Sequence, residues 1–306
     1  MTSVRHAPAV GAVSLGALSM LATLWVVWGA AYPIMALAMR WFEPLTLRCI
    51  VMTIAGAVLL GYAVAVGERL RLPRAHWVDF TIASLCNMTI LQVGMTYGVY
   101  LVGGARSAVL IYTMTIWTAL FARWLLGEPI TRRRAVALVM GVAAVGALVA
   151  QHLPDVRDAP LGIALNLVAA LAFGFGMVWT KRAAWPLGLA AMAGWQLLIG
   201  VAPLIAAWLV VMPRVPLDAV PGLGWAALAY MILGANVIAY FAWFPLVHRL
   251  PAAVLGIGSM ATPCVGVLAS ALIGGETVQP NDLLALALVC GALALVLFER
   301  PKKRHA

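Results

Sequence analysis

Residues 125–134 read LLGEPITRRR, so that a long apolar run ends on one acid and one proline and is followed by three arginines. Hydrophobic residues make up 64% of the 306-residue chain and charged residues 10%, whereas soluble domains carry about 45–50% and about 25%. A helix needs about 20 apolar residues to cross about 30 Å of hydrocarbon. The composition therefore indicates a membrane protein, and we expect this stretch to connect two membrane-spanning helices.

Ten apolar runs have the length of a spanning helix, and they predict an all-α membrane protein with ten transmembrane helices. A membrane β-barrel is disfavoured, because the runs lack the alternating segments of about ten residues that barrel strands show. The first run is too long for the apolar part of a secretory signal, so we interpret it as helix one. The predicted helices are residues 14–39, 45–66, 76–101, 105–126, 132–152, 161–181, 187–211, 225–246, 251–273 and 281–298.

The distribution of the positive charges predicts the orientation. The formal net charge is +10, and with the N-terminus in the cytoplasm the inner segments hold 15 of the 20 Lys and Arg residues. The outer segments then hold four, and Arg48 falls within helix two. Because positive residues concentrate in cytoplasmic loops, we expect both termini, including a basic tail at 299–306, to be cytoplasmic. Orientation thus explains the basic balance, and nucleic acid is not expected as a partner.

Several segments of the first half of the chain recur in the second half in the same order. Their offsets of 148, 145 and 149 residues indicate a duplication of five helices. Because five is odd, the second copy must insert with the opposite polarity, which predicts two inverted five-helix repeats at 14–152 and 161–298. Inverted repeats are typical of transporters that work by alternating access. The matched pairs are LLGEPIT at 125–131 with LIGGETV at 272–278, in which Glu128 and Glu276 are 148 residues apart, SAVL at 107–110 with AAVL at 252–255, and Asn87 with Asn236.

These features resemble the drug/metabolite transporter superfamily in its ten-helix, EamA-type exporter form, and within it the bacterial exporter of aromatic amino acids. The resemblance implies a multi-pass protein of the bacterial inner membrane that exports a small molecule, with substrate and lipid bilayer as partners and a monomer as a possible form. One departure is Thr115, which stands where the second copy has Pro263, so a kink in helix four is left open. The matching residues are Gly127-Glu128-Pro129, Gly275-Glu276-Thr277, the WGAAYP of 28–33, Arg48 after Pro44, and the Met-Ala-Thr-Pro of 260–263.

Aromatic and amide residues are the candidates for the substrate path. Helices one and eight each carry aromatic residues on one face, a pattern that also fits helix packing or lipid contact. A buried amide needs hydrogen-bond partners, so the two matched asparagines fit either interhelical bonds or a wet cavity, and their recurrence favours the cavity. The predicted substrate-binding residues are Trp28, Tyr32, Asn87, Tyr112, Asn236, Tyr240, Trp243 and Ser259.

Arg48 is the clear charge away from a helix end. A central position in the membrane costs on the order of 2.5–3.5 kcal/mol. Arg48 follows Pro44 by four residues, so its side chain could extend to the membrane surface. The alternative interpretation is a charge that binds a carboxylate or gates the path.

Other residues have structural interpretations. Glu128 is expected to end a helix and to accept hydrogen bonds from backbone N–H groups or from a basic partner, which Arg132 to Arg134 could supply. The four cysteines show no metal-ligand spacing, so packing is their expected role. Anchors at the membrane interface are expected at Trp41, Trp77, Trp185 and Trp225.

The motifs that the chain lacks narrow its function. It has no GxxxxGK[ST], HExxH or GxSxG motif, so we expect no catalytic residue, metal site or cofactor, and no enzyme. Acidic residues lie at or beyond helix ends, which favours a facilitator or exchanger of a neutral or zwitterionic molecule over strict proton coupling. Aromatic lining favours amino acids, including aromatic and other apolar ones. The alternatives are a broad-specificity exporter of drugs or other metabolites, and a membrane scaffold or assembly partner without transport activity.

Overall fold

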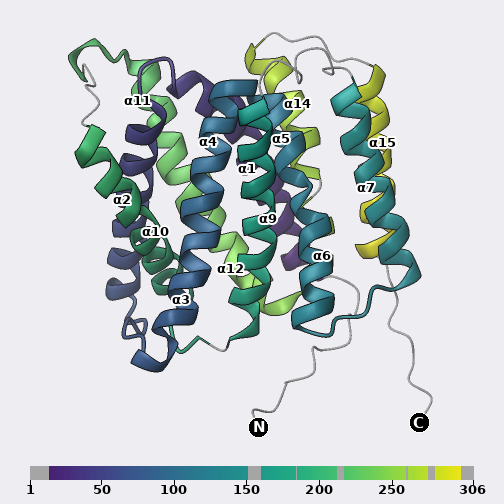
Figure 1. Ribbon diagram of the computed structural model, residues 1–306, viewed down its shortest axis with the longest axis horizontal. Coiled ribbons are helices and arrows are strands. Elements are labelled where there is room, and N and C mark those ends of the chain that lie inside the picture. The colour runs from purple at the N-terminus through teal and green to yellow at the C-terminus, as the bar shows by residue number, and fades with distance from the viewer. Residues whose placement is uncertain are drawn as a thin grey trace.

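The computed structural model describes residues 14–150, 160–183, 185–211, 217–259, 261–274 and 280–297, and within them helices occupy all ten predicted ranges to within a few residues (Figure 1). The helices of the first half are α1 (Leu15–Ala38), α2 (Pro44–Ala65), η1 (Arg74–His76), α3 (Trp77–Ser84), η2 (Leu85–Ile90), α4 (Leu91–Val102), α5 (Gly104–Tyr112), α6 (Met114–Leu125) and α7 (Arg132–Ala150). Those of the second half are α9 (Pro160–Arg182), α10 (Leu189–Val211), η3 (Leu217–Ala219), α11 (Gly222–Ala229), η4 (Tyr230–Ile238), α12 (Ala239–Arg249), α13 (Ala252–Gly258), α14 (Ala261–Gly274) and α15 (Pro280–Leu297).

Six helical segments of the described residues are long and apolar enough to cross a membrane. They are Leu15–Ala38, Pro44–Ala65, Arg74–Val102, Pro160–Arg182, Leu189–Val211 and Gly222–Arg249. Ten crossings and the orientation of the termini stay predictions. The predicted tail at 299–306 and the second Gly-Glu pair, Gly275 and Glu276, lie outside the described residues.

The opening stretch forms a helix end. The backbone N–H groups of Leu126 and Glu128 both donate to the carbonyl of Ala122 at 3.1 Å, which closes the last turn of α6. Gly127 has a φ of 65°, in the left-handed region that glycine adopts without strain. The chain then passes Pro129 and re-enters a helix at Arg132. LLGEPIT is therefore the turn between α6 and α7.

Acidic side chains cap other helices. Glu43 precedes α2 and accepts hydrogen bonds from the N–H groups of Leu45 and Thr46 at 3.1 and 3.0 Å. Glu68 lies beyond the end of α2 and accepts from the N–H of Ala191, in the first turn of α10, at 2.9 Å. These carboxylates satisfy N–H groups that have no partner within the helix.

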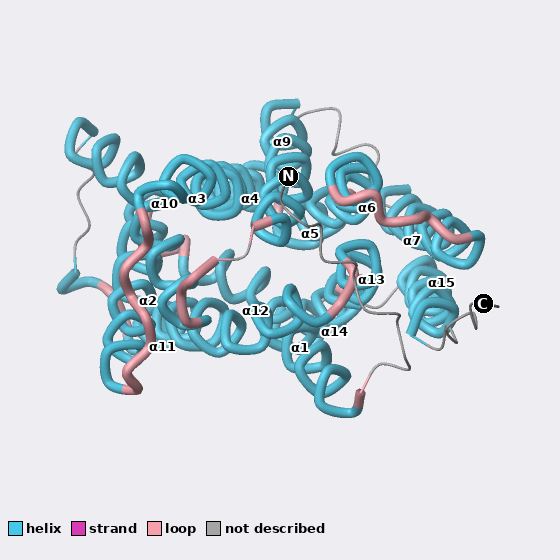
Figure 2. Tube along the Cα trace, turned by 90° about the horizontal axis from the view of Figure 1, so that it is seen from below, coloured by secondary structure: helices cyan, strands magenta, loops and turns pink. Residues whose placement is uncertain are grey.

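The packing of the first five helical segments has a counterpart in the second five. The helices α2 and α10 pack together, as do α7 and α15, which lie side by side at one edge of the molecule (Figure 1). The contact of α4 with α9 corresponds to that of α1 with η4 and α12, and the contact of α6 with α9 corresponds to that of α1 with α14. Seen from below, α3, α4 and α9 form one row, and α1, α12 and α14 form another (Figure 2).

Two glycines lie at corresponding crossings. Gly29 in α1 and Gly174 in α9 are 145 residues apart. A Cβ atom on Gly29 would lie 2.9 Å from the Thr262 carbonyl oxygen, and one on Gly174 would lie 2.9 Å from the Thr118 backbone nitrogen. Small residues allow this close approach of backbones, which is a main source of helix association in membranes.

Both halves have a break in the fourth helical segment. In the first half, α5 ends at Tyr112 and α6 begins at Met114, so helix four is interrupted without the proline of the second half. Thr113 at this break donates from Oγ1 to the Leu110 carbonyl at 2.7 Å, and such bonds from a hydroxyl compete with the helical ladder. The second half has its break between α13 and α14, at Ser259.

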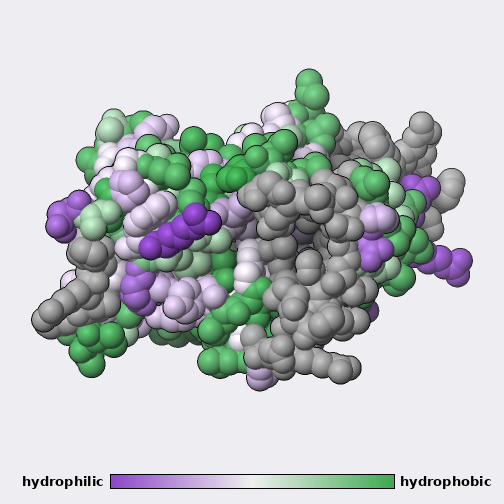
Figure 3. All heavy atoms as spheres, turned by 90° about the horizontal axis from the view of Figure 1, so that it is seen from above, coloured by the Kyte–Doolittle hydropathy of each residue, from purple (hydrophilic) through white to green (hydrophobic). Residues whose placement is uncertain are grey.

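The outer surface is rich in apolar side chains. Figure 3 shows hydrophobic residues over large areas of the visible surface, especially around its edge, and hydrophilic residues in separate patches. Two of the predicted anchors are exposed, Trp77 at 56% and Trp225 at 43%. The prediction for Trp185 is wrong, because this side chain is 8% exposed and packs edge-on against Phe80. The position of Trp185 between two predicted helices gave no sign of the aromatic rings of His76 and Phe80 that pack against it.

We predict that Gly174→Ala destabilises the protein and that Gly61→Ala does not. The added methyl group at residue 174 meets backbone that cannot move aside, whereas a Cβ on Gly61 has no neighbour within 4 Å. Overpacking typically costs about 1–3 kcal/mol. Thermal unfolding of the purified protein in detergent measures the difference. Equal midpoints for the two variants would contradict the close crossing of α9 and α6.

Candidate functional site

A central cavity of about 80 Å³ lies among helices of both halves. Its walls are mostly apolar and aromatic, with a few polar groups, as in most small-molecule sites. The residues that line it come from α1, α2, α4, α5, α6, α9, η4 and α12. They are Trp28, Ala31, Tyr32, Met35, Arg48, Leu91, Gln92, Met95, Ile111, Tyr112, Met114, Phe173, Met231, Ala235, Asn236 and Tyr240.

The structure brings most of the predicted site residues to this region. Those that line the central cavity are Trp28, Tyr32, Tyr112, Asn236 and Tyr240.

The remaining predicted residues lie elsewhere. Asn87 and Trp243 line a second space of about 10 Å³, which is about the room that one water molecule needs. Tyr240 and Phe173 line both spaces and therefore lie between them. Ser259 is buried at the break between α13 and α14 and lines neither space.

Hydrogen bonds and ring contacts hold the aromatic walls in place. The Trp28 indole nitrogen donates to the carbonyl of Ala235 in η4 at 3.0 Å. The ring of Trp28 packs on Trp243 with centroids 5.2 Å apart, and Trp243 packs on Phe173 at 5.7 Å. Trp28 thus faces the second half of the chain and joins α1 to the cavity wall.

The two matched asparagines both lie in wide-turn, π-helical segments, Asn87 in η2 and Asn236 in η4. Such segments are frequent at functional sites. Asn87 donates from Nδ2 to Thr180 Oγ1 at 2.9 Å and contacts Gln196 Oε1 at 3.4 Å, so it joins α9 and α10. Its environment fits the interhelical interpretation, whereas Asn236 faces the central cavity.

Arg48 is buried in the cavity wall. Its side chain is 1% exposed, so the interpretation in which it extends to the membrane surface is wrong. The guanidinium donates from Nε to Thr96 Oγ1 and from Nη2 to the Met35 sulfur at 2.7 Å. Helices α1 and α4 thus supply neutral acceptors that hold the arginine inward. Among the described residues that line the cavity, Arg48 is the only charged one.

Two residues that line the cavity each have a buried amide oxygen with no hydrogen-bond partner among the described residues. Asn236 donates from Nδ2 to the Met231 carbonyl at 2.7 Å, which leaves Oδ1 unpaired. Gln92 Oε1 is also unpaired and buried. Sequence reasoning missed Gln92, although an amide within the apolar run of helix three was a signal that could have found it.

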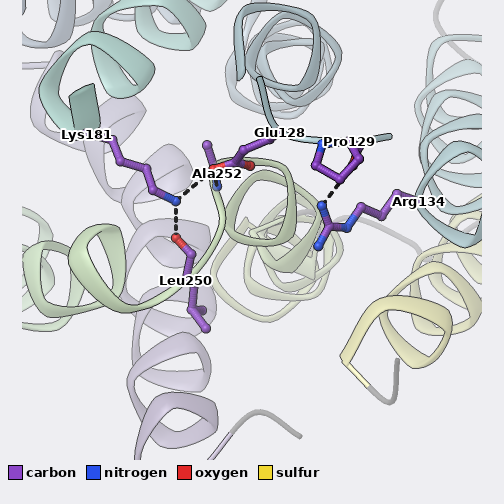
Figure 4. Close-up of polar contacts among 6 residues, drawn as sticks. All are labelled: Glu128, Pro129, Arg134, Lys181, Leu250 and Ala252. Carbon is purple, nitrogen blue, oxygen red and sulfur yellow. Dashed lines mark hydrogen bonds and ion pairs between the residues drawn. The ribbon is translucent and has the colours of Figure 1, made fainter. Parts of the chain in front are cut away.

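A second polar cluster, which we call the Glu128 latch, joins the two halves at one end of the bundle (Figure 4). Glu128 is 7% exposed, and its Oε1 accepts from Lys181 Nζ at 3.0 Å and from the backbone N–H of Ala252 at 3.1 Å. Lys181 Nζ also donates to the Leu250 carbonyl. The end of α6 is thereby tied to the end of α9 and the start of α13.

The latch has the kinds of partner that the sequence suggested for Glu128. A backbone N–H group and a basic side chain were both expected, but Lys181 was not named because it lies 53 residues away. Arg134, from the expected basic run, donates from Nη1 to the Pro129 carbonyl at 3.1 Å (Figure 4). This bond stabilises the turn between α6 and α7.

Comparison with known proteins identifies the family of the chain. A model of the EamA-like transporter family matches residues 15–150 and 160–298. The uncharacterized inner membrane transporter YedA of Escherichia coli K12 is 27% identical over 89% of this chain and 88% of its own length. Protein PecM of Dickeya dadantii is 24% identical over 90% of this chain and 92% of its own. One solved crystal structure, 22% identical, covers 91% of this chain and 95% of its own with a TM-score of 0.75, and it shows the same fold.

The two matched segments together span most of the chain, and the relatives are named as transporters of the inner membrane. The chain is therefore a multi-pass inner membrane transport protein and not an enzyme, and it belongs to the EamA-like transporter family.

Proposed function

We propose that this chain exports amino acids, including aromatic and other apolar ones, by alternating access through the central cavity. The observation that carries the proposal is the composition of that cavity, which combines one cation and neutral polar groups with aromatic and methionine walls. Apolar walls receive a hydrophobic side chain, and the polar groups receive a head group. Both halves of the chain contribute to the lining, as a site between two repeats requires.

We further propose that residues 14–152 and 161–298 are inverted repeats with both termini in the cytoplasm. Helix contacts made by the first five segments have counterparts among those made by the second five, and this correspondence supports the duplication. The corresponding crossings at Gly29 and Gly174 support it as well. The excess of positive residues in the segments on one side supports the orientation.

In this mechanism the Glu128 latch holds one end of the cavity closed. It joins α6 of the first half to α9 and α13 of the second, so the halves cannot separate at this end while the carboxylate keeps its partners. The charge distribution supports a cytoplasmic position for this end. Opening toward the cytoplasm then requires the Glu128–Lys181 pair to break.

We predict that the purified chain in liposomes exchanges phenylalanine, tryptophan, methionine or threonine across the membrane. Flux is expected to persist without a pH gradient, because the described cavity lining contains no Asp, Glu or His. Tracer exchange with and without an imposed gradient measures this. Failure to move any of the four amino acids would contradict the substrate class, and collapse of the flux without a gradient would contradict the mechanism.

We predict that Tyr112→Ala lowers this exchange at least ten-fold and that Tyr100→Ala leaves it within two-fold of the unmodified chain. Tyr112 is 2% exposed and lines the cavity, whereas Tyr100 is 60% exposed on α4 and serves as the matched control. Loss of a wall ring removes packing and contact area with the substrate. Rates are compared at equal amounts of reconstituted protein. Equal effects of the two substitutions would place the transport path elsewhere.

The Glu128–Lys181 pair is expected to act as one energetic unit. Breaking a buried pair by removing one partner costs about 3–5 kcal/mol, because the other charge stays buried. We therefore expect Glu128→Gln and Lys181→Gln to be non-additive, with a coupling of about 1–3 kcal/mol in a double-mutant cycle. Thermal or denaturant unfolding of the four proteins supplies the cycle. Additivity within about 0.5 kcal/mol would show that the latch does not hold the halves together.

A further inference from the structure

We propose that Arg48, Gln92 and Asn236 form a head-group site for a zwitterionic α-amino acid. In this site the Arg48 guanidinium binds the substrate carboxylate, and the amide oxygens of Gln92 and Asn236 accept hydrogen bonds from its ammonium group. The inference rests on the proposed function and deepens it, because it assigns the chemical group that the cavity recognises.

The first step of the argument is the charge of Arg48. A buried ion is stable only when hydrogen bonds and an opposite charge compensate the loss of water. The described partners of this guanidinium, Thr96 and Met35, are neutral and use Nε and Nη2. The described residues offer Nη1 no acceptor, and no carboxylate lines the described cavity. A ligand carboxylate supplies the missing charge, and the planar guanidinium matches its geometry.

The second step is the orientation of the amide oxygens. The exposed fractions of Gln92 and Asn236 are 5% and 1%, so neither side chain is solvated from the outside. The bond from Asn236 Nδ2 to the Met231 carbonyl fixes the amide so that Oδ1 is the free acceptor. An unpaired buried acceptor is unfavourable, because it has lost its hydrogen bonds to water without gaining others. An ammonium group carries three donors and can satisfy both oxygens.

The third step is the placement of these groups in the fold. Gln92 is the second residue of α4, in the first half of the chain, and Asn236 lies in η4 of the second half. An ammonium bound by both oxygens therefore joins the two halves, whereas the carboxylate is held by α2. Recognition of the two charges thus brings three helical segments together around one ligand.

The rest of the cavity wall is suited to side chains of different shape. Met35, Met95, Met114 and Met231 line the cavity beside its aromatic rings. Methionine is flexible and polarizable, so it fills irregular gaps against different partners. The structure thus combines a strict requirement for two head-group charges with tolerance of the apolar side chain.

The test compares four ligands on the unmodified chain, which needs no variant to fold. Liposomes that contain the full protein are loaded with labelled phenylalanine, and its efflux is stimulated by external phenylalanine, 3-phenylpropionate, phenethylamine or phenylalanine methyl ester. We expect phenylalanine to be effective at a concentration at least ten-fold below that of the other three, because each of them lacks one charge.

Each outcome of this test decides a part of the proposal. Equal potency of 3-phenylpropionate would overturn the role of the amide oxygens. Equal potency of phenethylamine or the methyl ester would overturn the role of Arg48. If phenylalanine is exchanged but all four ligands are equivalent, the head-group site is wrong and the proposed function stands. If no amino acid is exchanged, both are wrong.

Matched variants assign the ammonium contact to its residue. Asn236→Leu keeps the approximate size of the side chain but removes the oxygen, so the preference for phenylalanine over 3-phenylpropionate is expected to fall at least five-fold. Asn166→Leu is the control, because Asn166 is equally buried and also has an unpaired Oδ1, but it does not line the cavity, and its Nδ2 donates to Ser107 and Gly162. The ratio of two ligands does not depend on the amount of folded protein. An unchanged ratio in Asn236→Leu would remove Asn236 from the site.

Discussion

A chain that lies in hydrocarbon must satisfy its own backbone N–H and C=O groups, and the architecture of this protein follows from that constraint. Helices meet it along most of their length. At two irregular segments of the second half, tryptophan side chains of the first half supply hydrogen bonds to the backbone. Trp25 donates to the carbonyl of Gly258, at the end of α13, at 2.6 Å, and Trp28 donates to that of Ala235 in η4 at 3.0 Å. Helix α1 thereby covers the irregular backbone of the opposite half.

The same bonds explain why the polar centre is enclosed. Two of the wide turns carry asparagines that line internal spaces, and the packed rings of Trp28 in α1 and Trp243 in α12 line these spaces as well. The cavity is thus a product of irregular helices from two bundles that meet. The Glu128 latch repeats this principle at one end, where a carboxylate satisfies a backbone N–H of α13 and a cation of α9 together.

The helices could be predicted from the sequence because apolar length alone defines a spanning segment. The match of Asn87 with Asn236 was also visible in the sequence, but the wide turns on which both residues lie were not predicted. The directions of single side chains could not be predicted. Arg48 has the spacing from Pro44 that would let it reach the surface, and only the positions of Thr96 and Met35 on other helices show that it turns inward. Trp185 was misassigned for the same reason, because the residues that bury it lie on other elements.

The inward placement of Arg48 also bears on how the protein is made. During synthesis, Arg48 leaves the ribosome 48 residues before Thr96, whose hydroxyl accepts a hydrogen bond from the Arg48 guanidinium. Met35 of α1 is already available, 13 residues earlier in the chain. The translocon therefore receives a charged helix whose stabilising neighbours are incomplete until α4 arrives. The guanidinium of Arg48 can therefore have both of these partners only once α1, α2 and α4 are all in place.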